Sequence, residues 1–123
     1  MHDGYQQLEW REQDGVFSVR IKPDRLLEEG LEQLSMELLR LIHEAGCRKL
    51  ALCLGPDDFV CLYSIFLAKL MTVQHRLRDL GGKMALVEVN PNIEEIFRVT
   101  RMNNRFHFFP DEASAIQWLR EEG

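Results

Sequence analysis

Leu50–Leu80 reads LALCLGPDDFVCLYSIFLAKLMTVQHRLRDL, and this stretch decides the fold that we predict for the chain. Its first residues, Leu50–Leu54, are almost all apolar, which is typical of a strand covered on both faces. Gly55-Pro56-Asp57-Asp58 supplies turn residues. From about Ser64, apolar residues recur at steps of three and four, as on the buried face of a helix that Gly81-Gly82 ends. The predicted buried stripe comprises Phe66, Leu70, Val73, Leu77 and Leu80, widened by Leu67 and Met71.

A β-hairpin and a helix are predicted before this stretch. Asp14-Gly15 is a short hairpin signal that joins a ragged edge strand around Tyr5–Trp10 to the alternating strand Val16–Ile21. A helix then starts between Glu28 and Leu31 and is capped by Gly46. Its predicted buried stripe comprises Leu31, Leu34, Leu38, Leu41, Ile42 and Ala45, and the residues predicted to face water are Glu32, Glu37, Arg40 and Glu44.

Two further strands and two further helices are predicted after Gly82. Met84–Val89 is largely apolar and is predicted to be a strand. Asn90-Pro91 starts a helix, because Asn accepts hydrogen bonds from free backbone N–H groups and Pro fits the first helical position. Phe106–Phe109 is a short last strand, and Asp111 is the expected N-cap of the final helix.

The element order is therefore β-β-α-β-α-β-α-β-α. Alternation after the hairpin implies parallel strands joined by right-handed crossovers. We expect an α/β fold with a mixed sheet of about five strands and about four helices. The 123 residues suit a single domain over 1–123, with its core at about 5–119.

Composition excludes several functional classes. The net charge of −5, with acidic and basic residues interspersed, argues against a nucleic-acid-binding surface. No apolar run approaches the roughly 20 residues that span a bilayer, and the polar start has no signal-peptide character, so we expect a cytoplasmic protein without membrane insertion. The three cysteines and four histidines lack metal-ligand spacing, and no catalytic motif stands out. We therefore predict neither enzyme activity nor a cofactor, and we interpret the cysteines as free thiols.

Several segments in the same order resemble the STAS domain, the fold of bacterial anti-sigma-factor antagonists. Tyr63–Leu70 is similar to the family's Asp-Ser-Ser-Gly-Leu-x-x-Leu segment, and Gly81–Val87 to its Gly-Gly-x-Leu-x-Leu strand entry. Pro91–Met102 and Phe106–Trp118 resemble the family's last helix, strand and helix. The resemblance covers roughly Tyr5 to Leu119 and implies the STAS fold.

The resemblance also implies a switch. In this family a partner kinase, which is also the anti-sigma factor, phosphorylates the first serine of the motif, and that serine aligns with Ser64. Tyr63, Ile65 and Phe66 depart from the motif's Asp, second Ser and Gly. The predicted partner-binding residues are Asp57, Asp58, Leu62, Tyr63 and Ser64.

The role of Ser64 has two interpretations. As an N-cap, its hydroxyl would satisfy backbone N–H groups and contribute about 1 kcal/mol. As a switch, it would carry a phosphate that the partly positive helix terminus tolerates and that a protein interface repels. If Ser64 is a switch, the chain is predicted to be an antagonist that binds a kinase-type anti-sigma factor. If Ser64 is only a helix cap, the chain is predicted to be a non-switching STAS interaction subunit of a transport or signalling complex. A small-ligand sensor is a third hypothesis.

Overall fold

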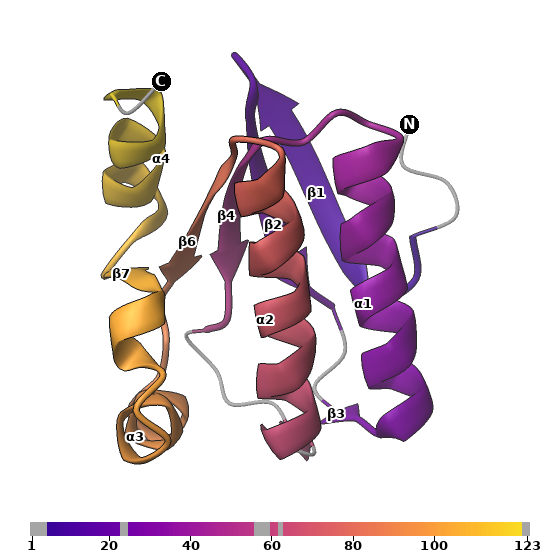
Figure 1. Ribbon diagram of the computed structural model, residues 1–123, viewed down its shortest axis with the longest axis vertical. Helices are drawn as coiled ribbons and strands as arrows, with labels where there is room; N and C mark the ends of the chain where they lie inside the picture. Colours follow the sequence, from indigo (N-terminus) through magenta and orange to yellow (C-terminus); the bar gives the residue numbers. More distant parts are fainter. Residues whose placement is uncertain (1–4, 23–24, 56–59, 62, 122–123) are drawn as a thin grey trace.

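The computed structural model describes residues 5–22, 25–55, 60–61 and 63–121. A five-stranded sheet forms the centre of the molecule, with helices on both faces (Figure 1). The elements in chain order are β1 (Leu8–Gln13), β2 (Val16–Ile21), β3 (Arg25–Leu26), α1 (Glu28–His43), β4 (Lys49–Cys53), β5 (Val60–Cys61), α2 (Tyr63–Asp79), β6 (Lys83–Val87), α3 (Pro91–Val99), the 3-10 helix η1 (Asn103–Arg105), β7 (His107–Phe109) and α4 (Glu112–Glu121).

The strand order is β1-β2-β4-β6-β7, with β1 and β2 antiparallel and all later neighbours parallel. Gln13 pairs with Val16 across the predicted hairpin turn. Asp14 and Gly15 have φ angles of 55° and 83°, the left-handed backbone that this type of tight hairpin turn requires. The predicted mixed sheet with an N-terminal hairpin and four helices is therefore confirmed.

Each face of the sheet has its own hydrophobic core. On one face, α1 and α2 pack over the large residues of β2, β4 and β6, and α3 adds Ile93 and Phe97 to the same core. On the other face, α4 packs against β4 and β6 through small side chains. Ala51, Ala85 and Ala115 lie in this second core and are at most 2% exposed, so α4 approaches the sheet closely. Strands β4 and β6 are covered on both faces, as their apolar sequences predict.

Three predicted element ends are wrong by one or two residues. Helix α2 ends at Asp79, and Leu80, which is predicted to belong to the buried stripe, is exposed. Helix α1 ends at His43, so Ala45 is also exposed. Strand β6 ends at Val87 instead of Val89, because Glu88 has a φ of 55° and the left-handed backbone turns the chain out of the sheet.

Glu37 is buried, although its place in the helix pattern predicts an exposed side chain. Its carboxylate accepts hydrogen bonds from the backbone N–H groups of Gln6 and Gln7, at 3.0 and 2.9 Å, and from Gln33 Nε2 at 2.9 Å. The segment before β1 covers this part of α1, and its backbone donors need an acceptor there. Glu37 thus fastens the start of the described chain to the helix layer.

A second, two-stranded sheet is an addition that the sequence did not predict. Arg25–Leu26 pairs in parallel with Val60–Cys61, so the segment that leads into α1 runs beside the segment that leads into α2. Two residue pairs are too short for a periodic hydrophobic signal. The pairing fixes where the two helices begin relative to one another.

Candidate functional site

The amino ends of α1 and α2 lie side by side at the edge of the sheet where the parallel strands end (Figure 1). This follows from the parallel crossovers, because each strand ends at this edge and each helix begins there. Lys69 of α2 and Glu32 of α1 form an ion pair of 2.6 Å across the two helices. The candidate site is therefore a surface that two helix termini share, here called the amino-end surface and defined by Leu27, Glu28, Glu29, Tyr63 and Ser64.

Ser64 is the second residue of α2 and is exposed. Since the helix begins at Tyr63, one residue earlier than predicted, the N-cap position falls on residue 62, which lies outside the described residues. Ser64 therefore lies inside the first turn, where the backbone N–H groups have no partner within the helix. Tyr63 and Ile65 are half-buried, and Phe66 is fully buried, as its place in the predicted stripe requires.

Only part of the predicted partner-binding set can be placed. Asp57, Asp58 and Leu62 lie outside the described residues, whereas Tyr63 and Ser64 are described. Sequence reasoning missed the contribution of α1 to this edge. Leu27 is 60% exposed at the N-cap of α1, and Glu28 and Glu29 form an exposed acidic first turn. The predicted parallel topology was the signal that could have placed them beside α2.

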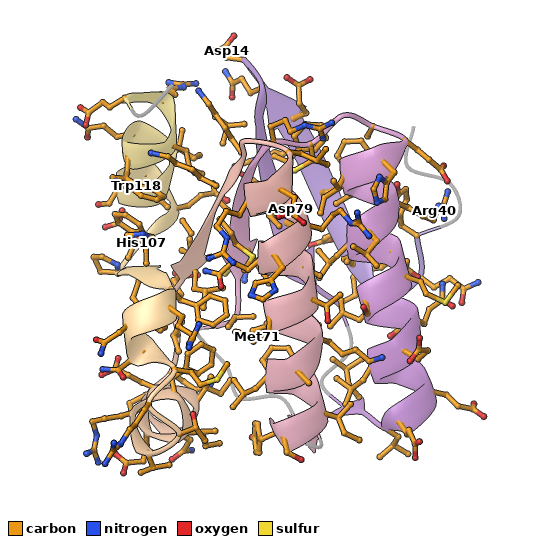
Figure 2. The ribbon with its side chains drawn as sticks, in the orientation of Figure 1. Asp14, Arg40, Met71, Asp79, His107 and Trp118 are labelled. Atoms are coloured by element: carbon orange, nitrogen blue, oxygen red, sulfur yellow. The ribbon has the colours of Figure 1, made fainter. Side chains whose placement is uncertain are left out.

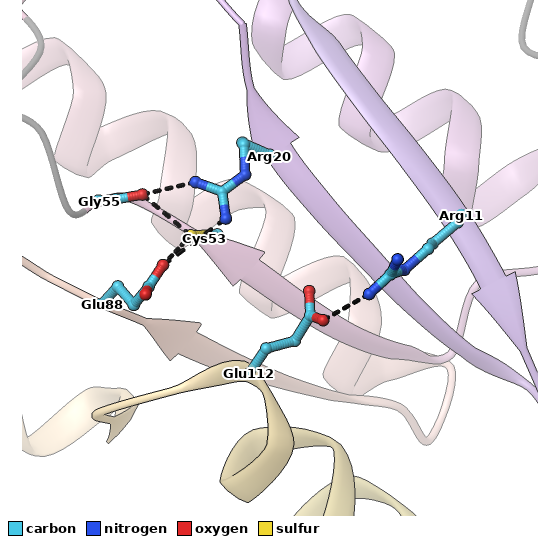
Figure 3. A network of polar contacts seen from close by, with 6 residues as sticks. All are labelled: Arg11, Arg20, Cys53, Gly55, Glu88 and Glu112. Carbon is cyan, nitrogen blue, oxygen red and sulfur yellow. Dashed lines mark hydrogen bonds and ion pairs between the residues drawn. The ribbon is translucent and has the colours of Figure 1, made fainter.

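A polar network lies beneath Gly55, where the chain leaves β4 (Figure 3). Arg20 donates from Nη1 to the Gly55 carbonyl at 2.7 Å and forms an ion pair with Glu88 at 3.6 Å. The Cys53 thiol lies 3.1 Å from the same carbonyl and 3.0 Å from Glu88 Oε1, and its single proton serves one of these acceptors at a time. Three neighbouring strands therefore fix the point from which the β4–α2 connection starts.

Gly55 is required at this point for a steric reason. A Cβ on Gly55 would lie 1.9 Å from the backbone oxygen of Glu88, far inside van der Waals contact. Glu88 itself holds a left-handed backbone, with a φ of 55°, which is uncommon for a residue with a side chain. Asn90 follows as the N-cap of α3 and accepts a hydrogen bond from the Ile93 N–H at 3.0 Å. The backbones of Gly55 and Glu88 are thus in close contact where the chain leaves β4 and β6.

The two described thiols are free and buried. Burial and the hydrogen bond with Glu88 raise the pKa of Cys53 to about 11, and burial raises the pKa of Cys47 to about 12. Both thiols are therefore protonated at neutral pH and are poor nucleophiles. Among the described residues, no three His, Cys, Asp or Glu side chains form a group that could hold a metal ion. No helix in the described ranges is long and apolar enough to cross a membrane.

No protein-family model matches this sequence, and no curated protein matches it significantly. Solved structures do match. A protein from Thermotoga maritima, described as a candidate anti-sigma factor antagonist, superposes with a TM-score of 0.80 at 19% identity, over 97% of this chain and 99% of that chain. The phosphorylated form of the Bacillus cell fate determinant SpoIIAA gives a TM-score of 0.67 at 13% identity, over 89% and 96% of the two chains.

A third match belongs to a different kind of protein. The murine anion transporter Solute Carrier 26 family member A9 gives a TM-score of 0.70 at 18% identity, over 90% of this chain and 18% of the transporter. With identities below 20%, these three likenesses establish the fold. The chain has the STAS fold that its sequence resemblance predicted.

Proposed function

We propose that this chain is a cytoplasmic, non-enzymatic regulatory domain that acts as an anti-sigma-factor antagonist. It binds a kinase-type anti-sigma factor through the amino-end surface, and phosphorylation of Ser64 releases that partner. The observation that carries the proposal is the exposure of Ser64 in the first turn of α2. The likeness to SpoIIAA, whose phosphorylated form has been solved, supports it.

The surroundings of Ser64 suit a protein interface. Leu27 is an exposed apolar side chain at the neighbouring helix terminus, and Tyr63 is half-buried beside Ser64. Covering an exposed apolar side chain with a partner removes apolar surface from water, which is favourable. Aromatic residues contribute strongly to the binding energy of interfaces. Glu28 and Glu29 make the surface acidic, which favours a partner with a basic face.

A phosphate on Ser64 would act on the partner more than on the fold. The first turn of α2 offers free N–H donors and the positive end of the helix dipole, which favour an anion by about 0.3–1 kcal/mol. The same group adds nearly two negative charges to a surface that must lose water on binding. The domain thus keeps its structure while the bound state becomes unfavourable.

The test is a binding titration against the anti-sigma factor with Ser64→Asp and Ser64→Ala. We expect Ser64→Ala to bind like the unmodified protein and Ser64→Asp to bind at least about tenfold more weakly, or ~1.4 kcal/mol. Thr72→Asp is the matched control, because Thr72 is exposed on the same helix two turns away. Equal affinities for the Ser64→Asp and Ser64→Ala variants would refute the switch. If Thr72→Asp weakened binding as much as Ser64→Asp, the effect would be one of net charge and not of the Ser64 position.

The likeness to the murine transporter favours a second candidate function, a non-switching interaction subunit of a transport or signalling complex. In that case the amino-end surface is a permanent contact and Ser64 is never modified. Co-purification with a membrane complex, together with an unmodified intact mass under several growth conditions, supports this function. A phosphate located on Ser64 by peptide mapping contradicts it.

A further inference from the structure

The far edge of the sheet contains a notch that the proposed function does not use. Strand β7 begins at His107, which pairs with Ala85, so Lys83 and Met84 of β6 extend beyond its start. A cavity of about 390 Å³ fills this notch. Its walls come from the second half of α2, from η1, β6 and β7, and from Trp118 of α4. We call it the edge groove.

The edge groove concentrates positive charge in an acidic protein. Arg78, Lys83 and Arg105 line it together with His107, and none of its described lining residues is acidic. Arg78 and Arg105 are exposed, and within the described part of the chain neither forms an ion pair. The whole chain carries a net charge of −5, so this clustering runs against the overall charge balance.

One wall of the groove is aromatic. The His107 and Trp118 rings lie beside one another at the open edge, with centroids 4.6 Å apart (Figure 2). Lys83 places Nζ 5.2 Å from the centroid of the Trp118 ring. A ligand in this groove would therefore meet cations and an apolar surface within the same small volume.

The backbone adds a further donor that points to the notch. Lys83 donates its N–H to Arg48 on the β4 side, and Glu88 donates its N–H to Phe109 on the β7 side. Because backbone groups alternate between the two sides of a strand, the Met84 N–H points to the β7 side, as that of Glu88 does. Strand β7 has not yet begun there. The N–H therefore faces the edge groove.

We propose that the edge groove binds a small organic phosphate, with the phosphate held by Arg78 and Arg105 and the apolar part against Trp118. Guanidinium groups pair with phosphate through parallel N–H donors. The volume of about 390 Å³ lies near the lower end of the range for small-molecule sites, about 300–1,000 Å³, and suits a small ligand. Ser64 and Arg78 are 14 positions apart on α2, so by the helical rise the two sites are separated by roughly 21 Å.

Sequence reasoning found no phosphate-binding motif, and the groove explains why. Its cationic residues, Arg78, Lys83 and Arg105, come from three separate elements, α2, β6 and η1. Phosphate motifs that are readable in a sequence place their donors in one loop. Here the sheet edge brings the donors together.

The test uses three probes of matched chemistry in calorimetric titrations at pH 7.5. Phenyl phosphate carries both the dianion and a ring, inorganic phosphate carries only the anion, and phenol carries only the ring. We expect saturable binding of phenyl phosphate, at least about tenfold tighter than either partial probe. No saturable heat with phenyl phosphate, or equal affinity for inorganic phosphate, would overturn the proposal.

Two variants locate the site. Arg78→Gln should weaken phenyl phosphate binding by about tenfold, since it removes one charged pair of ~1.4 kcal/mol. Arg76→Gln is the matched control, because Arg76 is exposed on the same helix and does not line the groove. Equal weakening by both variants would mean that bulk charge attracts the probe, and would overturn the assignment. Ser64 takes no part in this test, so its result is independent of the proposed partner switch.

Discussion

Replacing Glu37 by Ala should destabilise the protein far more than a substitution of any exposed glutamate. Glu37 is fully buried and accepts three hydrogen bonds, two of them from the backbone N–H groups of Gln6 and Gln7. Hydrogen bonds to a charged group contribute about 1.5–3 kcal/mol each, and a donor left without a partner costs its desolvation. Because water can re-enter beside the part-buried donors, we expect a total loss of roughly 3–5 kcal/mol.

Urea unfolding at neutral pH measures this loss. With a slope of about 2 kcal/mol per molar, the unfolding midpoint should fall by roughly 1.5–2.5 M. Glu37→Gln keeps the shape and one acceptor oxygen, so its loss should be intermediate. Glu32→Ala is the matched control on the same helix, because the exposed ion pair of Glu32 with Lys69 contributes at most about 1 kcal/mol.

Hydrogen exchange distinguishes local from global effects. The amides of Gln6 and Gln7 should lose protection in Glu37→Ala, because their acceptor is gone, and keep it in Glu32→Ala. The reasoning is refuted if Glu37→Ala unfolds within 1 kcal/mol of Glu32→Ala, or if the two amides remain equally protected. Either result would mean that the N-terminal segment is held by other contacts, such as that of the Tyr5 ring with the Arg40 guanidinium at 4.5 Å.

Two further predictions concern the base of the β4–α2 connection. Gly55→Ala should lower the free energy of unfolding in urea by about 1–3 kcal/mol, because its Cβ would lie 1.9 Å from the Glu88 oxygen. Gly30→Ala is the control and should be close to neutral, because its nearest contact is the flexible Leu26 side chain. Equal stability of the two variants would contradict the close approach of Gly55 to Glu88. The pKa of Cys53 is raised from 9.0 to about 11, so the folded state holds the thiol proton more tightly than the unfolded state. The contribution of this thiol to stability is complete below about pH 9 and is lost as the pH rises to about 11. Cys53→Ala should therefore flatten the decline of the free energy of unfolding between about pH 9 and 11. The same decline in the variant and in the unmodified protein would show that the Cys53 thiol is not the titrating group.

The fold could be predicted because its signals are local. Asp14-Gly15 specifies a tight turn through its own backbone preferences, and Asn90-Pro91 starts a helix through its own side chain and ring. The apolar runs of β4 and β6 reflect burial on both faces, which a single strand records in its own sequence. Alternating elements then leave few topologies open.

The errors arise where a distant segment decides the outcome. Glu37 has the helical position of an exposed residue, but its hydrogen-bond partners lie 30 and 31 positions earlier in the chain. The β3–β5 pairing joins Arg25–Leu26 to Val60–Cys61, which lies 35 positions later in the chain. Glu88 follows an apolar strand in the sequence, yet its backbone is left-handed, with a φ of 55°, and lies against Gly55, 33 positions earlier in the chain. No local pattern records such contacts.

The candidate site shows the same division. The position of Ser64 at the start of a helix follows from the stripe that begins at Phe66, and the structure confirms a helix from Tyr63. Its neighbours on α1 do not follow from that stripe, because Leu27 and Glu28 precede Ser64 by more than thirty residues. They reach the same surface because each parallel crossover starts its helix at the same edge of the sheet.

The departures of this chain from the family motif become understandable once burial is considered. Phe66 stands where the family has Gly, and its side chain is 0% exposed, so the added bulk lies in the core and not on the surface. Ile65 and Tyr63 are half-buried on either side of Ser64, which is the one exposed residue among these four. A sequence can therefore replace the three other motif residues and still present a serine hydroxyl in the first turn of α2. The proposed phosphorylation switch needs that hydroxyl and the helix terminus behind it, and both are present.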